Sequence, residues 1–95
     1  MIDQVLSSPT KIKILIVLWK FGEMNITELV RRVGASHRAT VQQLRQLIEH
    51  GVVEARQIGR MRLYRLPNDE AVQKLAEALA RADEWLASSK AQRLA

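Results

Sequence analysis

The stretch NITELVRRVGASHRATVQQLRQLIEHGVVEARQIGRMRLYRL, residues 25–66, predicts a short helix, a tight turn, a longer helix and a β-hairpin in succession. Asn25 is a favourable N-cap, and Glu28, three residues on, can reach back to it as in a capping box. Gly34 ends this short helix, and only two residues separate it from the next one. A short helix and a tight turn that lead into a polar-faced helix form the helix-turn-helix arrangement.

The longer helix is expected from about His37 to His50, with Ser36 as its N-cap and Gly51 as its stop. At about 100° per residue, its inner face carries His37, Thr40, Val41, Leu44, Leu47 and Ile48. Its outer face carries Arg38, Ala39, Gln42, Gln43, Arg45, Gln46 and Glu49. Solvated faces ordinarily mix both signs of charge, whereas this face has no acidic residue before Glu49. Such a helix suits the major groove of DNA.

The segment after Gly51 has the pattern of a β-hairpin, with runs 52–58 and 61–66 around a tight turn at Gly59-Arg60. The expected register forms one apolar side from the pairs Ile58 with Met61, Ala55 with Tyr64 and Val53 with Leu66. On the other side Glu54 pairs with Arg65, which have opposite charges. A hairpin directly after a helix-turn-helix predicts a wing whose tip reaches a neighbouring groove or phosphates.

A helix that opens at Ser8-Pro9 and ends at Gly22 precedes this region. Its apolar stripe is wide enough to predict a central helix, and we expect Trp19 in the core. A weaker amphipathic turn lies upstream, at Ile2, Val5 and Leu6.

A last helix is expected to open after Pro67, with Asn68 as its cap. Its apolar seam repeats at intervals of three and four residues and consists of Val72, Leu75, Leu79, Ala82 and Leu86. We expect the seam to form a dimer interface, which Trp85, Ile2, Val5 and Leu6 can join. The alternative is that the seam packs wholly on the first long helix of the same chain. The fold class is therefore mainly α with a small β-hairpin (α+β): a winged helix-turn-helix domain at residues 1–66 and an extended C-terminal helix at residues 67–95.

Composition narrows the class of protein further. A chain of 95 residues suits one hydrophobic core. The absence of cysteine excludes a disulfide scaffold, a thiolate zinc site, an iron–sulfur cluster and a cysteine nucleophile. The longest apolar run, residues 14–19, is far shorter than the ~20 residues that cross a bilayer, and the N-terminus lacks the pattern of a secretory signal. We expect a cytoplasmic protein with no metal, no cofactor and no membrane partner.

The positive charge is concentrated in one segment. The chain has a formal net charge of +5, and residues 31–65 hold eight arginines, no lysine and two glutamates. Arginine pairs with phosphate and guanine in a bidentate way, so this concentration favours a polyanionic partner. Converging carboxylates, a phosphate-binding glycine loop and a nucleophile–base pair are all missing, which argues against an enzyme.

Five stretches resemble a known family. Residues 6–15 (LSSPTKIKIL) look like the opening of ArsR-like winged-helix regulators. Residues 25–29, 34–41 and 44–53 are similar to the helix-turn-helix core shared with MarR-like regulators, and residues 59–66 look like their wing. The resemblance covers about residues 5 to 66. It implies a DNA-binding transcriptional regulator, usually a homodimer formed through terminal helices. Members that sense metals use Cys or clustered His and acids, and this chain has neither pattern.

The residues expected to contact DNA fall into two groups. On the recognition helix they are Ser36, His37, Arg38, Ala39, Gln42, Gln43 and Gln46. On the wing they are Arg60, Met61 and Arg62. We expect structural roles instead for Arg31, Arg32 and Arg65. We predict a homodimeric, sequence-specific transcriptional regulator, a repressor, that binds double-stranded DNA. The alternative is a winged-helix protein-interaction module of a transcription or repair assembly.

Overall fold

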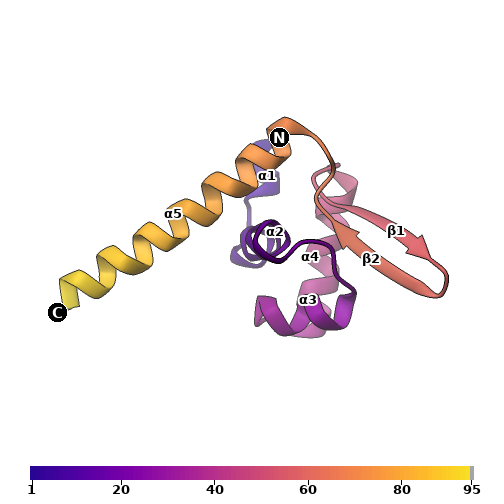
Figure 1. Cartoon of the computed structure of the whole chain (residues 1–95), viewed down its shortest axis with the longest axis horizontal. Coiled ribbons are helices and arrows are strands. Elements are labelled where there is room, and N and C mark those ends of the chain that lie inside the picture. Colours follow the sequence, from indigo (N-terminus) through magenta and orange to yellow (C-terminus); the bar gives the residue numbers. More distant parts are fainter. Residues whose placement is uncertain (95) are drawn as a thin grey trace.

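The computed structural model describes the backbone of residues 1–94 and the side chains of residues 1–90. Its elements are α1 (Ile2–Val5), α2 (Pro9–Phe21), α3 (Ile26–Val33), α4 (His37–Glu49), β1 (Glu54–Ile58), β2 (Met61–Arg65) and α5 (Glu70–Leu94). This order confirms the expected winged helix-turn-helix with an extended C-terminal helix. Figure 1 shows α2 end-on in the middle of the helices, the hairpin projecting to one side and α5 to the other.

Helix α2 lies at the centre of the core. Its N-cap is Ser8, whose hydroxyl accepts a hydrogen bond from the Lys11 backbone N–H at 3.1 Å. Five consecutive residues, 14–18, are buried. The expectation that Trp19 lies in the core was wrong. This residue is 36% exposed and borders a surface groove. This tryptophan stands at the end of the buried stretch, where the groove beside Gln73 leaves one side uncovered.

The short α1 is held against α2 by a buried lysine. The Lys11 ammonium donates to the Gln4 carbonyl at 3.0 Å and to the Ser7 hydroxyl at 2.9 Å, and the residue is only 3% exposed. Val5 of α1 is buried in the core. Of the three N-terminal residues offered for a dimer interface, Val5 and Leu6 therefore pack within their own chain, whereas Ile2 is exposed.

The helix-turn-helix forms with the expected caps. The Asn25 side chain accepts from the Glu28 backbone N–H at 2.9 Å, and the Ser36 hydroxyl accepts from the Ala39 N–H at 3.0 Å. Gly34 adopts a left-handed conformation (φ 78°), which a side chain would strain. The expected reciprocal bond from Glu28 is replaced, because its carboxylate pairs instead with Arg31 at 2.6 Å and Arg32 at 2.8 Å.

The hairpin has the expected register, with Ile58 opposite Met61, Ala55 opposite Tyr64 and Glu54 opposite Arg65. The expected division into faces was wrong. Side chains alternate along a strand, so Ile58 and Met61 share a face with the Glu54–Arg65 pair and are 48% and 53% exposed.

The hairpin is fastened to the loop between α2 and α3 at two places. The backbones of Met24 and Tyr64 exchange hydrogen bonds of 3.1 and 2.8 Å, which extends the sheet by one bridge. The Arg56 guanidinium donates to both carboxylate oxygens of Glu23, at 2.5 and 2.7 Å. The position of the wing is therefore set by the same loop that ends the central helix.

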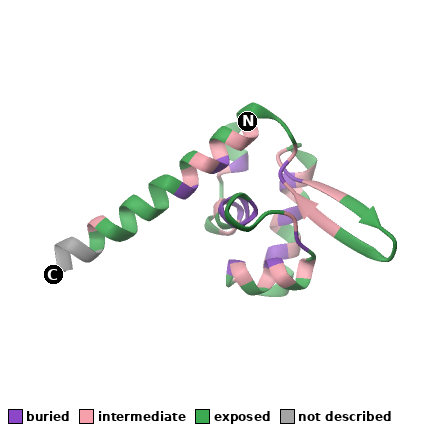
Figure 2. Ribbon diagram, viewed as in Figure 1, coloured by how far each residue is buried: buried purple, intermediate pink, exposed green. Residues whose placement is uncertain are grey.

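Helix α5 begins on the core and then leaves it. Its cap is Asp69, whose carboxylate accepts from the Val72 N–H at 3.2 Å, and not the expected Asn68. Ala76 and Ala80 are buried, and Lys20 of α2 pairs with Glu84 at 3.3 Å. Figure 2 shows the exposure rising along the helix toward its C-terminal end.

The expected apolar seam of α5 is split by this geometry. Val72, Leu75 and Leu79 are half-buried against the core of their own chain, whereas Ala82 and Leu86 are exposed. The neighbouring Trp85 is 65% exposed. The first three residues of the seam therefore pack on their own chain, as the alternative to a dimer interface predicts, and the last two do not.

Replacement of Thr40 should change the stability of the fold. This residue is fully buried, and its hydroxyl has no hydrogen-bond partner within the part of the chain that the structure describes. Thr40→Val keeps the shape and removes the unpaired hydroxyl, so we expect the free energy of unfolding to rise by about 1 kcal/mol in urea denaturation. Thr27→Val, at an exposed position of α3, is the control and should change little. A destabilised Thr40→Val would show that the hydroxyl is satisfied.

The glutamates of the ion pairs predict how stability depends on pH. The Arg56 hydrogen bond lowers the pKa of Glu23, and bonds from Arg31 and then Arg32 lower the pKa of Glu28. A carboxylate with a lowered pKa stabilises the fold above its unfolded pKa, and this contribution is lost as the pH falls through the folded pKa, here from about 4.5 downward. In acid titrations followed by circular dichroism, Glu23→Gln/Glu28→Gln should lose less stability than the parent over that range. An unchanged acid dependence would contradict the assignment, and Glu49→Gln controls for loss of one exposed charge.

Candidate nucleic-acid interface

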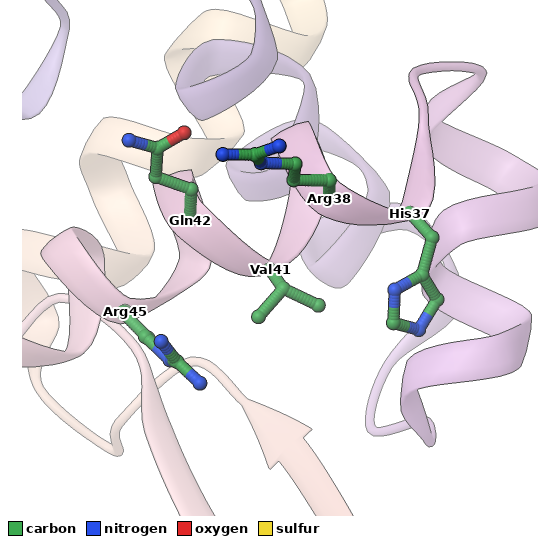
Figure 3. Close-up of a pocket in the computed structure, with 5 residues that line it drawn as sticks. All are labelled: His37, Arg38, Val41, Gln42 and Arg45. Atoms are coloured by element: carbon green, nitrogen blue, oxygen red, sulfur yellow. The ribbon is translucent and has the colours of Figure 1, made fainter.

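The outer side of α4 carries an open hollow of about 410 Å³. It is lined by His37, Arg38, Val41, Gln42 and Arg45. Figure 3 shows these side chains projecting from one helix, with Arg38 and Gln42 on one side of it and His37, Val41 and Arg45 on the other. The hollow combines two guanidinium groups, an amide, an imidazole and one apolar side chain, and no carboxylate lines it.

The eight arginines of residues 31–65 divide into two sets of four. Four have carboxylate partners: Arg31 and Arg32 with Glu28, Arg56 with Glu23, and Arg65 with Glu54. The other four have no ion pair among the described side chains, and they are Arg38, Arg45, Arg60 and Arg62. The unpaired set lies on α4 and on the wing, so its charge is available to a ligand.

Helix α4 and the wing, which consists of β1, β2 and their turn, meet in a crevice of about 280 Å³. Arg45 of α4 and Arg62 of β2 both line it, together with Val41, Leu44, Ile48 and Tyr64. The Arg62 guanidinium lies 6.0 Å from the centre of the Tyr64 ring, within the range of a cation–π contact. The crevice makes the hollow and the wing one continuous cationic surface.

The wing residues expected to contact DNA lie at and beside the turn. Arg60 follows Gly59, which has a φ of 59°, and the turn is held by a bond from the Gln57 side chain to the Gly59 carbonyl at 3.1 Å. Arg60, Met61 and Arg62 are all exposed. Alternation along β2 places Met61 and Arg62 on opposite faces of the hairpin.

Two of the expected recognition residues point elsewhere. The Gln43 side chain accepts a 2.9 Å hydrogen bond from the hydroxyl of Ser8, at the start of α2. Gln46 lines a shallow hollow beside α1, together with Lys11. Ser36 uses its hydroxyl as the cap of α4, and Ala39 is half-buried. The structure thus gathers His37, Arg38 and Gln42 from the expected set and leaves Gln43 and Gln46 toward the N-terminal helices.

Arg45 and Val41 belong to the hollow but were not among the expected contact residues. Helical periodicity places Arg45 on the outer face of this helix and Val41 on its inner face. The angular position of Val41, at the edge of the inner face, was the available signal. Periodicity alone does not show that the wing opens a crevice beside this edge.

Two features are absent from the part of the chain that the structure describes. No three His, Asp or Glu side chains there come together as a metal site. Among the helices that the structure describes, none combines the length and apolarity that a membrane span requires.

Comparisons with known proteins agree with this architecture. Residues 7–58 match the model of the MarR family. No curated protein matches the chain in sequence. Among solved structures, it is similar to the transcriptional repressor BigR from Xylella fastidiosa, at 31% identity over 82% of this chain and 75% of that one (TM-score 0.73).

Two other solved structures are also similar. A predicted DNA-binding transcriptional regulator from E. coli shares 26% identity over 85% of this chain and 84% of that one, with a TM-score of 0.75. The M. tuberculosis protein Rv0081 shares 33% identity over 96% of this chain and 87% of that one, with a TM-score of 0.66. Since the family model covers more than half of the 95 residues, the chain belongs to the MarR family of winged-helix transcriptional regulators.

Proposed function

We propose that this protein is a sequence-specific repressor that binds double-stranded DNA as a homodimer. The observation that carries the proposal is the segregation of the arginines: those without carboxylate partners in the described structure, Arg38, Arg45, Arg60 and Arg62, all lie on α4 and the wing. A surface that holds positive charge without neighbouring acids is suited to a polyanion.

Helix α4 would enter the major groove, which is about 12 Å wide and admits an α-helix. Arg38 and Arg45 would donate to guanine edges, and Gln42 to an adenine edge. His37 and the Ser36 end of α4 would contact phosphate, because free backbone N–H groups and the helix dipole favour anions there. Ala39, Gln43 and Gln46 would lie beside the groove, with Gln43 oriented by Ser8.

The wing would extend the contact beyond the major groove. Arg60 at the turn and Arg62 beside it are exposed and have no ion pair within the described residues. Because the hairpin is fastened by Arg56 to Glu23, its tip is held at a set position relative to α4. Met61 lies between the two arginines and would rest against the sugar backbone.

A second copy of the chain would cover the outer half of α5. Ala82, Trp85 and Leu86 are exposed there, beyond the residues that pack on the chain's own core. A helix of 25 residues is about 38 Å long, so it reaches well past one winged domain. A two-fold pair would present two recognition helices to half-sites about one helical turn apart. Repression would follow from occupancy of such a site.

The affinity for DNA should fall as the salt concentration rises, and the wing arginines should account for part of this dependence. Each phosphate neutralised releases counterions and adds roughly −0.9 to the slope of log affinity against log salt. In fluorescence-anisotropy titrations over a salt series, Arg60→Ala/Arg62→Ala should flatten the parental slope by about two such increments and weaken binding to any duplex.

The control for this prediction removes two positive charges elsewhere. Lys74→Ala/Arg81→Ala on α5 changes the net charge equally and should keep the parental slope within error. If the wing variant kept the parental slope as well, the wing would not touch phosphate.

Dimerisation should depend on the exposed end of α5. Trp85→Glu/Leu86→Glu places two charges in the proposed apolar interface, and we expect sedimentation equilibrium to show a folded monomer with reduced affinity for a two-half-site duplex. Ala87→Glu/Ser88→Glu adds the same charges about half a turn away and should leave the dimer intact. A parent that sediments as a monomer, or a double variant that stays dimeric, would refute the interface.

A further inference from the structure

Val41 is the apolar member of the hollow on α4, and packing in the core does not account for it. Leu44 and Leu47 are buried and Ile48 packs against the core, whereas Val41 is half-buried and lies outside that cluster. Figure 3 shows its two methyl groups directed away from the helix into the open space between His37 and Arg45. It also lines the crevice beneath the wing.

An apolar side chain on this surface has a specific counterpart in DNA. The edges of the bases in the major groove display hydrogen-bonding groups, and the C5-methyl group of thymine is the apolar feature among them. We infer that Val41 contacts a thymine C5-methyl group and so selects an A·T pair at one position of each half-site. This inference rests on the proposed function, because it requires α4 to lie in the major groove.

The spacing of the neighbouring side chains along α4 predicts the DNA sequence around this A·T pair. Arg38 and Arg45 are seven residues apart, or about 10.5 Å along the helix axis. Base pairs follow one another at about 3.4 Å, so this separation corresponds to about three base steps. Val41 and Gln42 lie between the two arginines. The half-site core would therefore consist of two G·C pairs, read by the arginines, with two base pairs between them, and the A·T pair read by Val41 is one of these two.

Gln42 strengthens the same preference from the other base of the pair. A glutamine amide pairs with N6 and N7 of adenine. Gln42 neighbours Val41 in sequence, and both line the hollow. Methyl contact and amide pairing would thus act together on one A·T pair or on two adjacent ones.

Replacement of thymine by deoxyuridine tests the inference, because it removes the methyl group and leaves the base-pairing groups unchanged. Duplexes selected in vitro by the parent protein would be substituted one thymine at a time and titrated by anisotropy. At one thymine of each half-site we expect the parental affinity to fall about threefold to fivefold, the effect of one buried methyl-sized group. Val41→Ala should bind both duplexes with equal affinity.

Two control variants distinguish the loss of the methyl contact from a general effect of the substitution on folding. Val30→Ala truncates another half-buried valine, on α3, and should keep the parental preference for thymine. Val41→Ile retains methyl groups at the proposed contact and should also keep it. Circular dichroism would establish that each variant is folded.

The outcomes distinguish this inference from the proposal on which it rests. A parent that binds a selected sequence but tolerates uracil at every position overturns the role of Val41 and leaves the DNA-binding function intact. A Val41→Ala variant that keeps the thymine preference overturns it equally. A parent that selects no sequence overturns both the proposed function and this inference.

Discussion

Burial of α2 is the constraint on which the rest of the structure depends. Residues 14–18 of this helix are each at most 4% exposed, and five consecutive residues cover more than a full turn, so apolar groups must surround the helix on all sides. Helices α3, α4 and α5 supply that cover. Because α4 meets this need with Leu44 and Leu47, its opposite side remains free for a ligand. The placement of the candidate interface is thus a consequence of core packing.

Ion pairing then determines where the positive charge is available. Exposed ion pairs contribute little to stability, commonly up to about 1 kcal/mol. They do, however, neutralise the charge of the surface around them. Glu23, Glu28 and Glu54 are each engaged by arginines outside the α4 hollow, so their charges are compensated locally. Arg38 and Arg45 face the hollow without a carboxylate in its lining. A segment that is basic along its whole length therefore acquires one cationic surface.

Local signals in the sequence predicted the elements well, whereas three-dimensional placement lay beyond them. Ser8, Asn25 and Ser36 cap helices as expected, and the cross-strand pairing followed from the turn at Gly59. The orientation of Gln43 depends on a contact with Ser8, 35 residues away, which helical periodicity does not contain. Helical periodicity also does not show that Val41 faces a crevice made by the wing. Nor does it show which part of the α5 seam is buried, because the point where α5 leaves the core depends on how it crosses α2.

The proposed DNA-binding surface consists of the α4 hollow and the wing tip. Chemical-shift mapping tests it most directly, since amide and arginine side-chain signals of a 10.8 kDa chain can be followed individually during titration with a selected duplex. We expect the largest changes at Arg38, Val41, Gln42 and Arg45 and at Arg60, with little change over the first turns of α5. Changes confined to α5 or to the hollow beside α1, with α4 unaffected, would contradict it.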